Sequence, residues 1–354
     1  MEKVREILDR SYRLFIGIDV HLVSWTVTIR TRDVELKTIT MAANCTALEA
    51  FLRPYMGHPL QVVYEAGYFG YSLCDFLQSK RIDCVVTPPN LVPDSAGNRV
   101  KTDKKDSRKL AQCLSNGELK RVYVPTAEER SARMVSRRRR QLIADRVRVQ
   151  HRIKAELRFH GITIVEPRAQ WSACYRDNLG RITFHDRWGT ESFQQLLTEF
   201  DHLTGQIASQ NRLLNELSQT DRYRDRVKLL RSIPGIGPIG AMEFLLELQD
   251  ISRFHTAKAL AAYLGLTPSQ YSSGEHTHMG SITRTGKPSL RGQLVESAWI
   301  LVAKDAGMRT RYERLRARTG GKRAIVAIAR RLALIARRVL LSREPYQPGI
   351  SPAV

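Results

Sequence analysis

Cysteine is scarce in this 354-residue chain, and long apolar runs are missing from it. The five cysteines, at positions 45, 74, 84, 113 and 174, are odd in number and show no Cys-x-x-Cys spacing. They therefore predict neither a disulfide framework nor a zinc site. No apolar run approaches the ~20 residues of a membrane span. Residues 1–13 are charged and contain no apolar signal core, so we expect a cytoplasmic protein that does not enter a membrane.

Acidic residues are also few relative to basic ones. Lys and Arg total 57 against 35 Asp and Glu, which gives a formal net charge of +22. Such an excess favours a polyanionic partner, with a merely solubilising surface charge as the alternative. A chain of this length is expected to form two or three domains, each with a core of its own.

The few carboxylates of the first third follow a pattern. The apolar segment Leu14–His21 predicts a buried strand with one carboxylate, Asp19, near its end, and a buried charge without a partner is costly. Residues 25–30 alternate like the returning strand of an antiparallel hairpin. Residues 60–65 predict a second core strand that ends on Glu65. Strands and helices alternate up to about residue 125, which indicates a mixed α/β sheet.

A third acidic element opens the helix predicted from about residue 101. Asp103 and Asp106 are three residues apart and share a face with two leucines further along, so we expect that face to lie against the sheet. The preference of acidic residues for a first helical turn is an alternative explanation. With Asp19 and Glu65 they form a four-carboxylate set that suits Mg²⁺ or Mn²⁺. Two such ions about 3.5–4 Å apart can activate a nucleophile and stabilise the leaving oxygen in phosphoryl transfer.

Two long helices are predicted between residues 126 and 225. The first begins with Thr126 as its cap and has no Gly or Pro before Gly161. Its basic face predicts either a solvated surface or contact with nucleic acid, and its central arginines are Arg137, Arg138, Arg139 and Arg140. The second helix, residues 191–220, repeats apolar residues every seven positions, which is typical of a coiled coil. Its partner is either the first helix or another subunit.

The C-terminal third contains two candidate nucleic-acid elements. Gly235 and Gly237 predict a helix-hairpin-helix, in which missing side chains let backbone N–H groups approach a phosphate. A tight turn between packed helices is the alternative. A loop rich in Gly and Ser follows from about residue 266, and its basic candidates for nucleic-acid contact are Arg284, Lys287 and Arg291. A serine becomes a nucleophile only when a base or a metal activates it, and most Ser-Ser-Gly loops are turns.

Five motifs in order along the chain together carry a family resemblance. They are Gly17-Ile-Asp19-Val-His21, Tyr64-Glu65-Ala-Gly67, Lys101-Thr-Asp103-Lys-Lys-Asp106, Ile233-Pro-Gly-Ile-Gly237, and Tyr263-Leu-Gly-Leu-Thr-Pro268 with Ser272-Ser273-Gly274 and Ile282-Thr-Arg284-Thr-Gly286 behind it. The chain resembles the DEDD-type insertion-sequence transposases, also called bridge-RNA-guided recombinases.

The resemblance implies a fold and a division of the chain. Residues 10–125 would form an α/β ribonuclease H-like (RuvC-like) catalytic domain, whose Asp19, Glu65, Asp103 and Asp106 hold Mg²⁺, with Mn²⁺ as a possible substitute. Residues 126–225 would be coiled-coil helices for dimerisation. Residues 226–345 would be a mostly α C-terminal transposase domain with the helix-hairpin-helix and the serine loop.

The resemblance also implies the chemistry and the partners. The family serine directly precedes a glycine, which indicates Ser273 as the nucleophile, with Ser272 as the fallback. Glu275 departs from the usual sequence of this loop, in which many relatives have a second glycine. The serine would form a covalent phosphoserine link to DNA. A noncoding guide RNA would pair with double-stranded donor and target DNA, and homodimers would assemble into tetramers with shared active sites. The alternatives are a metal-dependent, structure-specific nuclease that uses water, and a non-catalytic nucleic-acid-binding scaffold.

Overall fold

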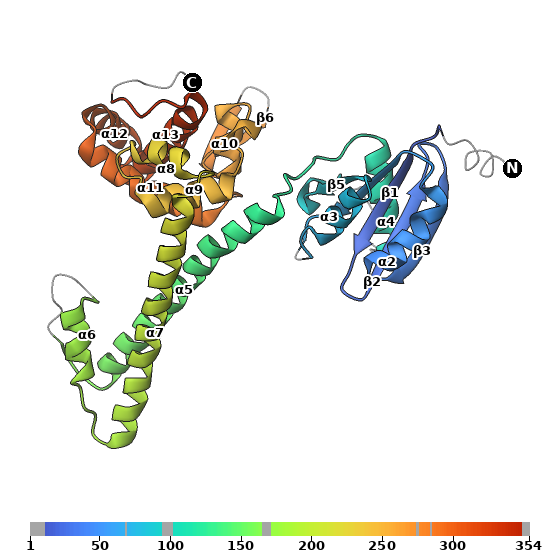
Figure 1. Ribbon diagram of the computed structural model, residues 1–354. Coiled ribbons are helices and arrows are strands. Elements are labelled where there is room, and N and C mark those ends of the chain that lie inside the picture. The colour runs from blue at the N-terminus through green and yellow to red at the C-terminus, as the bar shows by residue number, and fades with distance from the viewer. Residues whose placement is uncertain are drawn as a thin grey trace. The chain divides into compact units, whose positions relative to one another are not determined.

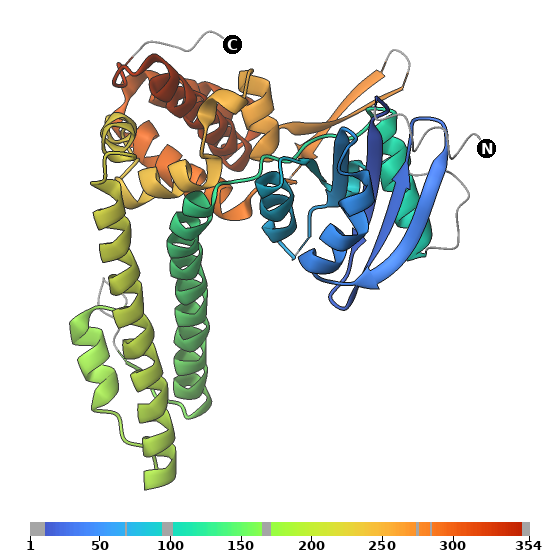
Figure 2. The ribbon, with the colours of Figure 1, turned by 45° about the vertical axis from the view of Figure 1, so that its right-hand side comes forward.

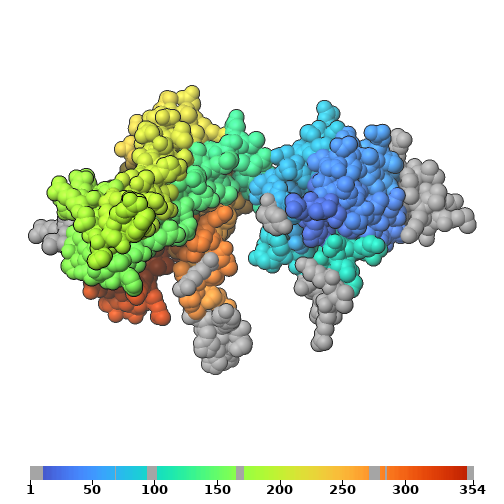
Figure 3. Space-filling view, turned by 90° about the horizontal axis from the view of Figure 1, so that it is seen from below, coloured from blue at the N-terminus to red at the C-terminus, as the bar shows by residue number. Residues whose placement is uncertain are grey.

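The structure of the protein is a computed structural model that describes residues 11–67, 69–93, 102–164, 171–273, 276–283 and 285–348, with the backbone alone within residues 271–279. The chain divides between Val124 and Pro125 into two compact units, which are described one at a time. In Figures 1 and 3 the first unit runs from blue to teal and the second from green to red. The three-domain division made from the sequence stays a prediction.

The first unit is built on one five-stranded sheet (Figure 1). Its strands are β1 (Leu14–Val20), β2 (Ser24–Arg30), β3 (Glu35–Ala42), β4 (Leu60–Glu65) and β5 (Asp83–Thr87), in the order β3-β2-β1-β4-β5. The pairs β1–β2 and β2–β3 are antiparallel, whereas β1–β4 and β4–β5 are parallel. The mixed sheet predicted from the sequence is therefore confirmed. Strand β3 was not predicted, because its half-buried and exposed residues form no apolar run.

Helices cover both faces of this sheet. Helices α2 (Cys45–Leu52) and α3 (Ser72–Ser79) share a core with Ile16 and Ile18 of β1. Helix α4 (Asp103–Ser115) packs on the other face, where Leu110 and Leu114 meet Val63 of β4. Successive side chains of a strand point to opposite faces. Asp19 is one residue past Ile18 and therefore points to the α4 face. Among the described residues of this unit, Arg53–Tyr55 and Pro89–Leu91 form short 3₁₀ turns.

Gly17 lets helix α4 approach strand β1 closely. A Cβ atom at this position would lie 2.2 Å from the Ser107 carbonyl oxygen and 2.5 Å from the Ala111 nitrogen. The Ser107 hydroxyl is buried and lies 2.9 Å from the Thr28 hydroxyl of β2, which fixes the helix on the sheet. This contact brings the first turn of α4 beside the end of β1, where Asp19 is.

The second unit begins with two long helices that lie side by side (Figure 2). They are α5 (Ala127–Phe159) and α7 (Arg187–Ser218), with the short α6 (Ala173–Gly180) between them in the chain. Thr126 and Glu129 form a reciprocal capping box, which confirms the predicted start of α5. Apolar residues of both helices form one core, among them Leu142, Val149, Phe193 and Phe200. The sequence left two packing partners for the second long helix, the first long helix or another subunit. In the structure α7 packs against the first long helix, α5.

The rest of the second unit is mostly helical. Its elements are α8 (Arg224–Arg231), α9 (Pro238–Leu248), a 3₁₀ turn (Ile251–Arg253), α10 (Ala257–Tyr263), α11 (Pro288–Lys304), α12 (Ala306–Thr319) and α13 (Gly321–Ser342). One large core joins them, and α13 runs through it with Ile328, Leu332 and Ala336 fully buried. None of the helices in the described residues is both long enough and apolar enough to cross a membrane.

The glycine- and serine-rich segment was predicted as a loop, and the structure corrects this. Strands β6 (Pro268–Ser273) and β7 (His276–Ile282) pair there as an antiparallel ribbon. Aromatic and β-branched residues such as Tyr271, Thr277 and Ile282 favour extended backbone. The apolar pattern used to find the other strands is absent from β6 and β7, because a two-stranded ribbon need not bury a face.

Candidate active site

The carboxylates of strands β1 and β4 lie on neighbouring parallel strands. Ile18 is in register with Tyr64, so the next residues along the two strands are Asp19 and Glu65. Both side chains point to the α4 face, because each follows a residue packed on the opposite face. The side chain of Asp19 is 19% exposed, whereas Glu65 is an exposed residue. The sequence placed Asp19 and Glu65 near the ends of two core strands, and the structure adds that these strands are parallel neighbours.

The first turn of α4 adds two more carboxylates to this edge. Thr102 caps the helix by accepting a hydrogen bond from the Lys105 N–H, and Asp103 and Asp106 follow it in the first turn. Burial raises the pKa of Asp19, and the negative charges of Asp103 and Asp106 act in the same direction. Carboxylates that disfavour one another's charge are stabilised by a cation between them. Oxygen donors in this arrangement fit a divalent ion such as Mg²⁺.

A histidine that the sequence reasoning had not counted as a ligand lies in the same cluster. His21 Nε2 lies 3.1 Å from Asp19 Oδ2 and 3.8 Å from Asp103 Oδ1. Among the described residues, Asp19, His21 and Asp103 can each place one ligand atom within 4.8 Å of the others. The sequence signal for His21 was its position two residues beyond Asp19, at the end of the same strand.

The arginines predicted to contact nucleic acid have different surroundings. Arg139 Nη1 donates to Glu243 Oε1 at 3.0 Å, and Arg140 Nη2 donates to Glu247 Oε1 at 2.6 Å. Both guanidinium groups are therefore half-buried in ion pairs with α9. Arg137 and Arg138 are exposed, although Arg137 Nε also lies 3.7 Å from Glu247 Oε1. A role in nucleic-acid binding stays a prediction for all four.

Glu247 lies near basic side chains from two separate parts of the chain, helix α5 and the residue before α11. Lys287 Nζ lies 3.9 Å from Glu247 Oε2, and the Glu247 side chain is only 3% exposed. Burial alone would raise the pKa of Glu247, but the hydrogen bond from Arg140 and the charges of Lys287, Arg140 and Arg137 outweigh burial and hold the pKa below its usual value. In Glu243 burial prevails, so that its pKa is raised in spite of Arg139.

The two glycines of the predicted helix-hairpin-helix differ in their surroundings. Gly235 has φ of +93°, and a Cβ atom there would lie 2.3 Å from the Ser297 carbonyl oxygen of α11. Packing inside the unit thus already requires a glycine at 235. Gly237 precedes α9, and a Cβ atom there would meet nothing within 4 Å. The approach of a phosphate to this turn stays a prediction.

Of the remaining predicted residues, the structure describes the two serines in strand β6 and Arg291 in helix α11. Ser272 and Ser273 end β6, and their backbones pair with Thr277 and His276 of β7. Arg291 Nη1 donates to the Leu264 carbonyl oxygen at 3.1 Å. Arg284 lies outside the described residues. The ribbon belongs to the second unit and the carboxylates to the first.

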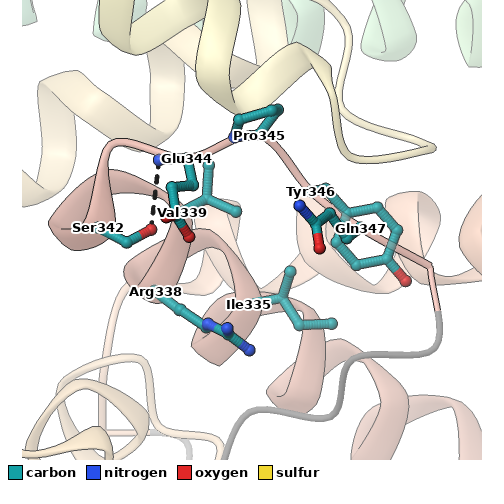
Figure 4. A pocket seen from close by; sticks show the side chains of 8 residues that line it. All are labelled: Ile335, Arg338, Val339, Ser342, Glu344, Pro345, Tyr346 and Gln347. Atoms are coloured by element: carbon teal, nitrogen blue, oxygen red, sulfur yellow. Dashed lines mark hydrogen bonds between the residues drawn. The ribbon is translucent and has the colours of Figure 1, made fainter.

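A pocket in the second unit contains none of the predicted catalytic residues. It lies between the end of α13 and the segment that follows it, where the Glu344 backbone N–H donates to the Ser342 hydroxyl (Figure 4). Tyr346 of this segment donates its hydroxyl proton to Asp305 at 2.7 Å. The residues that line the pocket are Ile335, Arg338, Val339, Ser342, Glu344, Pro345, Tyr346 and Gln347. The carboxylate cluster therefore remains the candidate active site.

Comparison with known families matches both units of the chain. Residues 16–161 match the DEDD transposase family of IS110 elements, and residues 227–313 match the family described as "Transposase IS116/IS110/IS902 family". The first match contains all four carboxylates, and the second contains Gly235, Gly237 and the serine ribbon.

Individual relatives agree with the family matches. The transposase-like protein y4qE of Sinorhizobium fredii is 32% identical over 239 residues, which are 67% of this chain and 57% of that protein. The transposase for insertion sequence element IS1533 of Leptospira borgpetersenii is 22% identical over 331 residues, 91% of this chain and 94% of that protein. The pilin gene-inverting protein of Moraxella bovis is 30% identical over 157 residues, 44% of this chain and 46% of that protein.

The chain spans less than two thirds of the length of two transposase-like proteins of Sinorhizobium fredii, 57% of y4qE and 65% of y4pF/y4sB. The match to the IS1533 transposase extends over nearly the whole of both chains. With an acidic cluster at the edge of its sheet and both family segments in order, the chain belongs to the IS110-type family of DEDD transposases.

Proposed function

We propose that this protein cuts and rejoins DNA strands to move an insertion sequence. The observation that supports this most directly is the grouping of Asp19 and Asp103 beside His21 at the end of β1, with the charge of Asp106 acting on Asp19. Glu65 ends the neighbouring parallel strand and would complete the set of four carboxylates. When bound there, a divalent ion would lower the pKa of an attacking oxygen and stabilise the leaving oxygen. The fold of the first unit is compatible with the ribonuclease H-like domain that such carboxylates serve.

Ser273 is the nucleophile in this proposal, with Ser272 as the fallback. Its Oγ attacks a DNA phosphorus atom, a P–Oγ bond forms, and the bond from phosphorus to one deoxyribose oxygen breaks. The hydroxyl proton of the serine leaves to solvent, and the freed deoxyribose oxygen takes up a proton. Reversal with a different deoxyribose hydroxyl rejoins the strand, so that no external energy source is needed. The position of the serine pair at the end of strand β6 supports a role at the tip of a ribbon.

The partners in this proposal are double-stranded donor and target DNA and a noncoding guide RNA. The net charge of +22 supports a polyanionic partner but does not distinguish DNA from RNA. The α5–α7 pair, as a coiled coil, would hold a second protein chain, and dimers would assemble into tetramers with shared active sites. The α8–α9 turn would contact the DNA backbone as a helix-hairpin-helix.

The guide RNA is tested by purification. The protein is expressed together with the noncoding DNA that flanks its gene and purified without ribonuclease, and the copurifying RNA is sequenced. We expect one discrete, structured RNA encoded by that flank. Bulk cellular RNA in a preparation that still nicks branched DNA would favour the alternative, a metal-dependent nuclease that uses water.

A non-catalytic scaffold is the third function to be tested. The basic face of α5 and the α8–α9 turn would be sufficient for such a protein. The substitution Asp103→Asn separates the scaffold from the other two functions. It replaces one carboxylate oxygen by an amide nitrogen and removes the charge at an exposed position. We expect DNA binding to persist and strand cleavage to be lost. Unchanged cleavage would show that the carboxylate cluster is not the catalytic centre.

A further inference from the structure

His21 occupies an exposed turn that core packing does not explain. The turn joins β1 to β2, and the His21 backbone N–H donates to the Ser24 carbonyl oxygen at 3.2 Å. Its side chain is 52% exposed, yet the Nε2 atom of the imidazole faces the acidic cluster. Nε2 lies between two carboxylates that come from different elements, Asp19 of β1 and Asp103 of α4.

We propose that His21 is a nitrogen ligand of the divalent ion at this cluster and makes the site favour a first-row transition ion over Mg²⁺. This inference rests on the proposed function, which already places a divalent ion on the carboxylates. It adds a fifth protein side chain to that set and assigns the choice of metal to it.

The distances between the ligand atoms suit a shared ion. At bond lengths of about 2.1 Å, adjacent corners of an octahedron lie about 3.0 Å apart and opposite corners about 4.2 Å apart. The 3.1 Å between His21 Nε2 and Asp19 Oδ2 corresponds to adjacent corners. The 3.8 Å between His21 Nε2 and Asp103 Oδ1 lies between the two values. All three ligand atoms lie within 4.8 Å of one another, which is compatible with binding one ion.

Imidazole and carboxylate differ in the metals they select. Mg²⁺ is a hard ion that takes oxygen ligands and keeps several waters, so a nitrogen donor adds little to its binding. First-row transition ions accept imidazole nitrogen readily. Mn²⁺ is the weakest binder of that series at a given site, so a preference for Mn²⁺ over Mg²⁺ sets a lower limit for the others.

The competing explanation is that His21 is only a counter-ion or a hydrogen-bond partner of Asp19. In that case the ring would stay outside the coordination sphere and would not change which metal binds. Direct spectroscopic detection of the nitrogen therefore separates the two explanations better than any activity assay.

Mn²⁺ alone, added to the full-length protein, is the probe. Pulsed electron paramagnetic resonance detects magnetic coupling between bound Mn²⁺ and a directly coordinated ¹⁴N nucleus, and titration with Mg²⁺ as competitor gives the relative affinity. The variants are His21→Ala and, as a matched control, His185→Ala, which removes an exposed histidine of the second unit. Asp19→Asn tests whether the ion binds at the carboxylates at all.

We expect ¹⁴N coupling in the native protein and in His185→Ala, and its loss in His21→Ala. We also expect His21→Ala to lower the affinity for Mn²⁺ by about tenfold or more, since losing even an outer-shell partner of a metal costs about 10–100-fold. The affinity for Mg²⁺ should fall by less, because a nitrogen donor adds little to its binding. Mn²⁺ that binds in an Asp19-dependent manner without ¹⁴N coupling would overturn the role of His21 and leave the metal site intact. Mn²⁺ binding that ignores Asp19→Asn would overturn the metal site itself.

Discussion

Asp19 is the residue at which burial and charge conflict most directly in the first unit. Its carboxylate is largely buried, and Asp103 and Asp106 add negative charge beside it. A folded protein keeps such a cluster when an ion or a reaction depends on it. Within this described cluster, the side chain that can carry a positive charge is His21, whose Nε2 lies 3.1 Å from Asp19 Oδ2.

Replacing Asp19 by Asn is expected to separate stability from activity. The amide is nearly isosteric and removes a charge that burial disfavours, so we expect stability to stay the same or to rise by up to about 1 kcal/mol. Strand cleavage should nevertheless be lost, because an amide is a poor ligand for a divalent ion. Urea unfolding and a DNA nicking assay on the same preparation measure both effects. A variant that is both less stable and still active would contradict this view of the residue.

Glu247 is the second residue with a clear prediction, and here the charge stabilises the fold. Glu247→Gln leaves Arg140 and Lys287 without their buried partner and should cost about 3 kcal/mol of unfolding free energy. Glu243→Gln is the matched control on the same helix. It should cost less, because burial raises the pKa of Glu243 and the charged form is less favoured there. Urea unfolding of both variants measures the difference, and equal losses would contradict the assignment.

The Glu247 effect should depend on pH in a defined direction. Its pKa is lower in the folded protein than the ordinary value of 4.5, so the folded state binds fewer protons than the unfolded state near that pH. The stabilisation is thus complete above about pH 4.5 and is lost as the pH falls through the folded-state pKa. The difference between native protein and Glu247→Gln should shrink below pH 4.5. A difference that grows on acidification would refute the sign.

At the scale of elements, the position of α4 on β1 decides whether the carboxylates meet. Gly17→Ala should push the helix away, since its Cβ would lie 2.2 Å from the Ser107 carbonyl oxygen. We expect a loss of about 1–3 kcal/mol of stability, as for other overpacked sites, and a larger loss of strand cleavage than of DNA binding.

The same substitution at Gly205 in α7 serves as the control for Gly17→Ala. A Cβ atom there meets nothing within 4 Å, and alanine is the better helix former by about 1 kcal/mol. Gly205→Ala should therefore be neutral or stabilising in thermal unfolding. If Gly17→Ala were equally harmless, the close contact between α4 and β1 would not be what positions Asp103.

The sequence predicted some elements well and others poorly, for physical reasons. Strand β4 and the start of α5 were found because an apolar run and a capping threonine are local signals. Strand β3 and the β6–β7 ribbon were missed because neither has an apolar run. The carboxylate set was predicted from strand ends and helix spacing. The place of His21 in the cluster could not be predicted, because it depends on how α4 docks on the sheet.

The basic residues show the same limit. From the sequence, Arg137, Arg138, Arg139 and Arg140 were equivalent members of one basic run. Only the packing of α9 against α5 reveals that Arg139 and Arg140 are paired with buried glutamates. Charge composition thus predicted a polyanion-binding protein. Which arginines are exposed and which form buried ion pairs depends on tertiary contacts.

At the scale of the whole molecule, the net charge of +22 predicts salt-dependent binding to DNA. The logarithm of the affinity should fall linearly with the logarithm of the salt concentration. Arg138→Ala should reduce the slope by about 1 if this exposed guanidinium contacts a phosphate. Arg139→Ala should leave the slope unchanged and lower stability instead, since its guanidinium is bound to Glu243. Fluorescence anisotropy over a salt series measures both, and equal slope changes would contradict the distinction.

The covalent chemistry is the central claim, and trapping the protein on DNA tests it most directly. The purified protein, with its copurifying RNA, is incubated with end-labelled DNA that carries the junctions of the element, denatured, and separated by electrophoresis. We expect a labelled protein–DNA adduct that forms in the native protein and in Ser272→Ala, and that is absent from Ser273→Ala and Asp19→Asn. Strand cleavage or recombination by Ser273→Ala, or metal-dependent nicking with no adduct in the native protein, would contradict the serine mechanism.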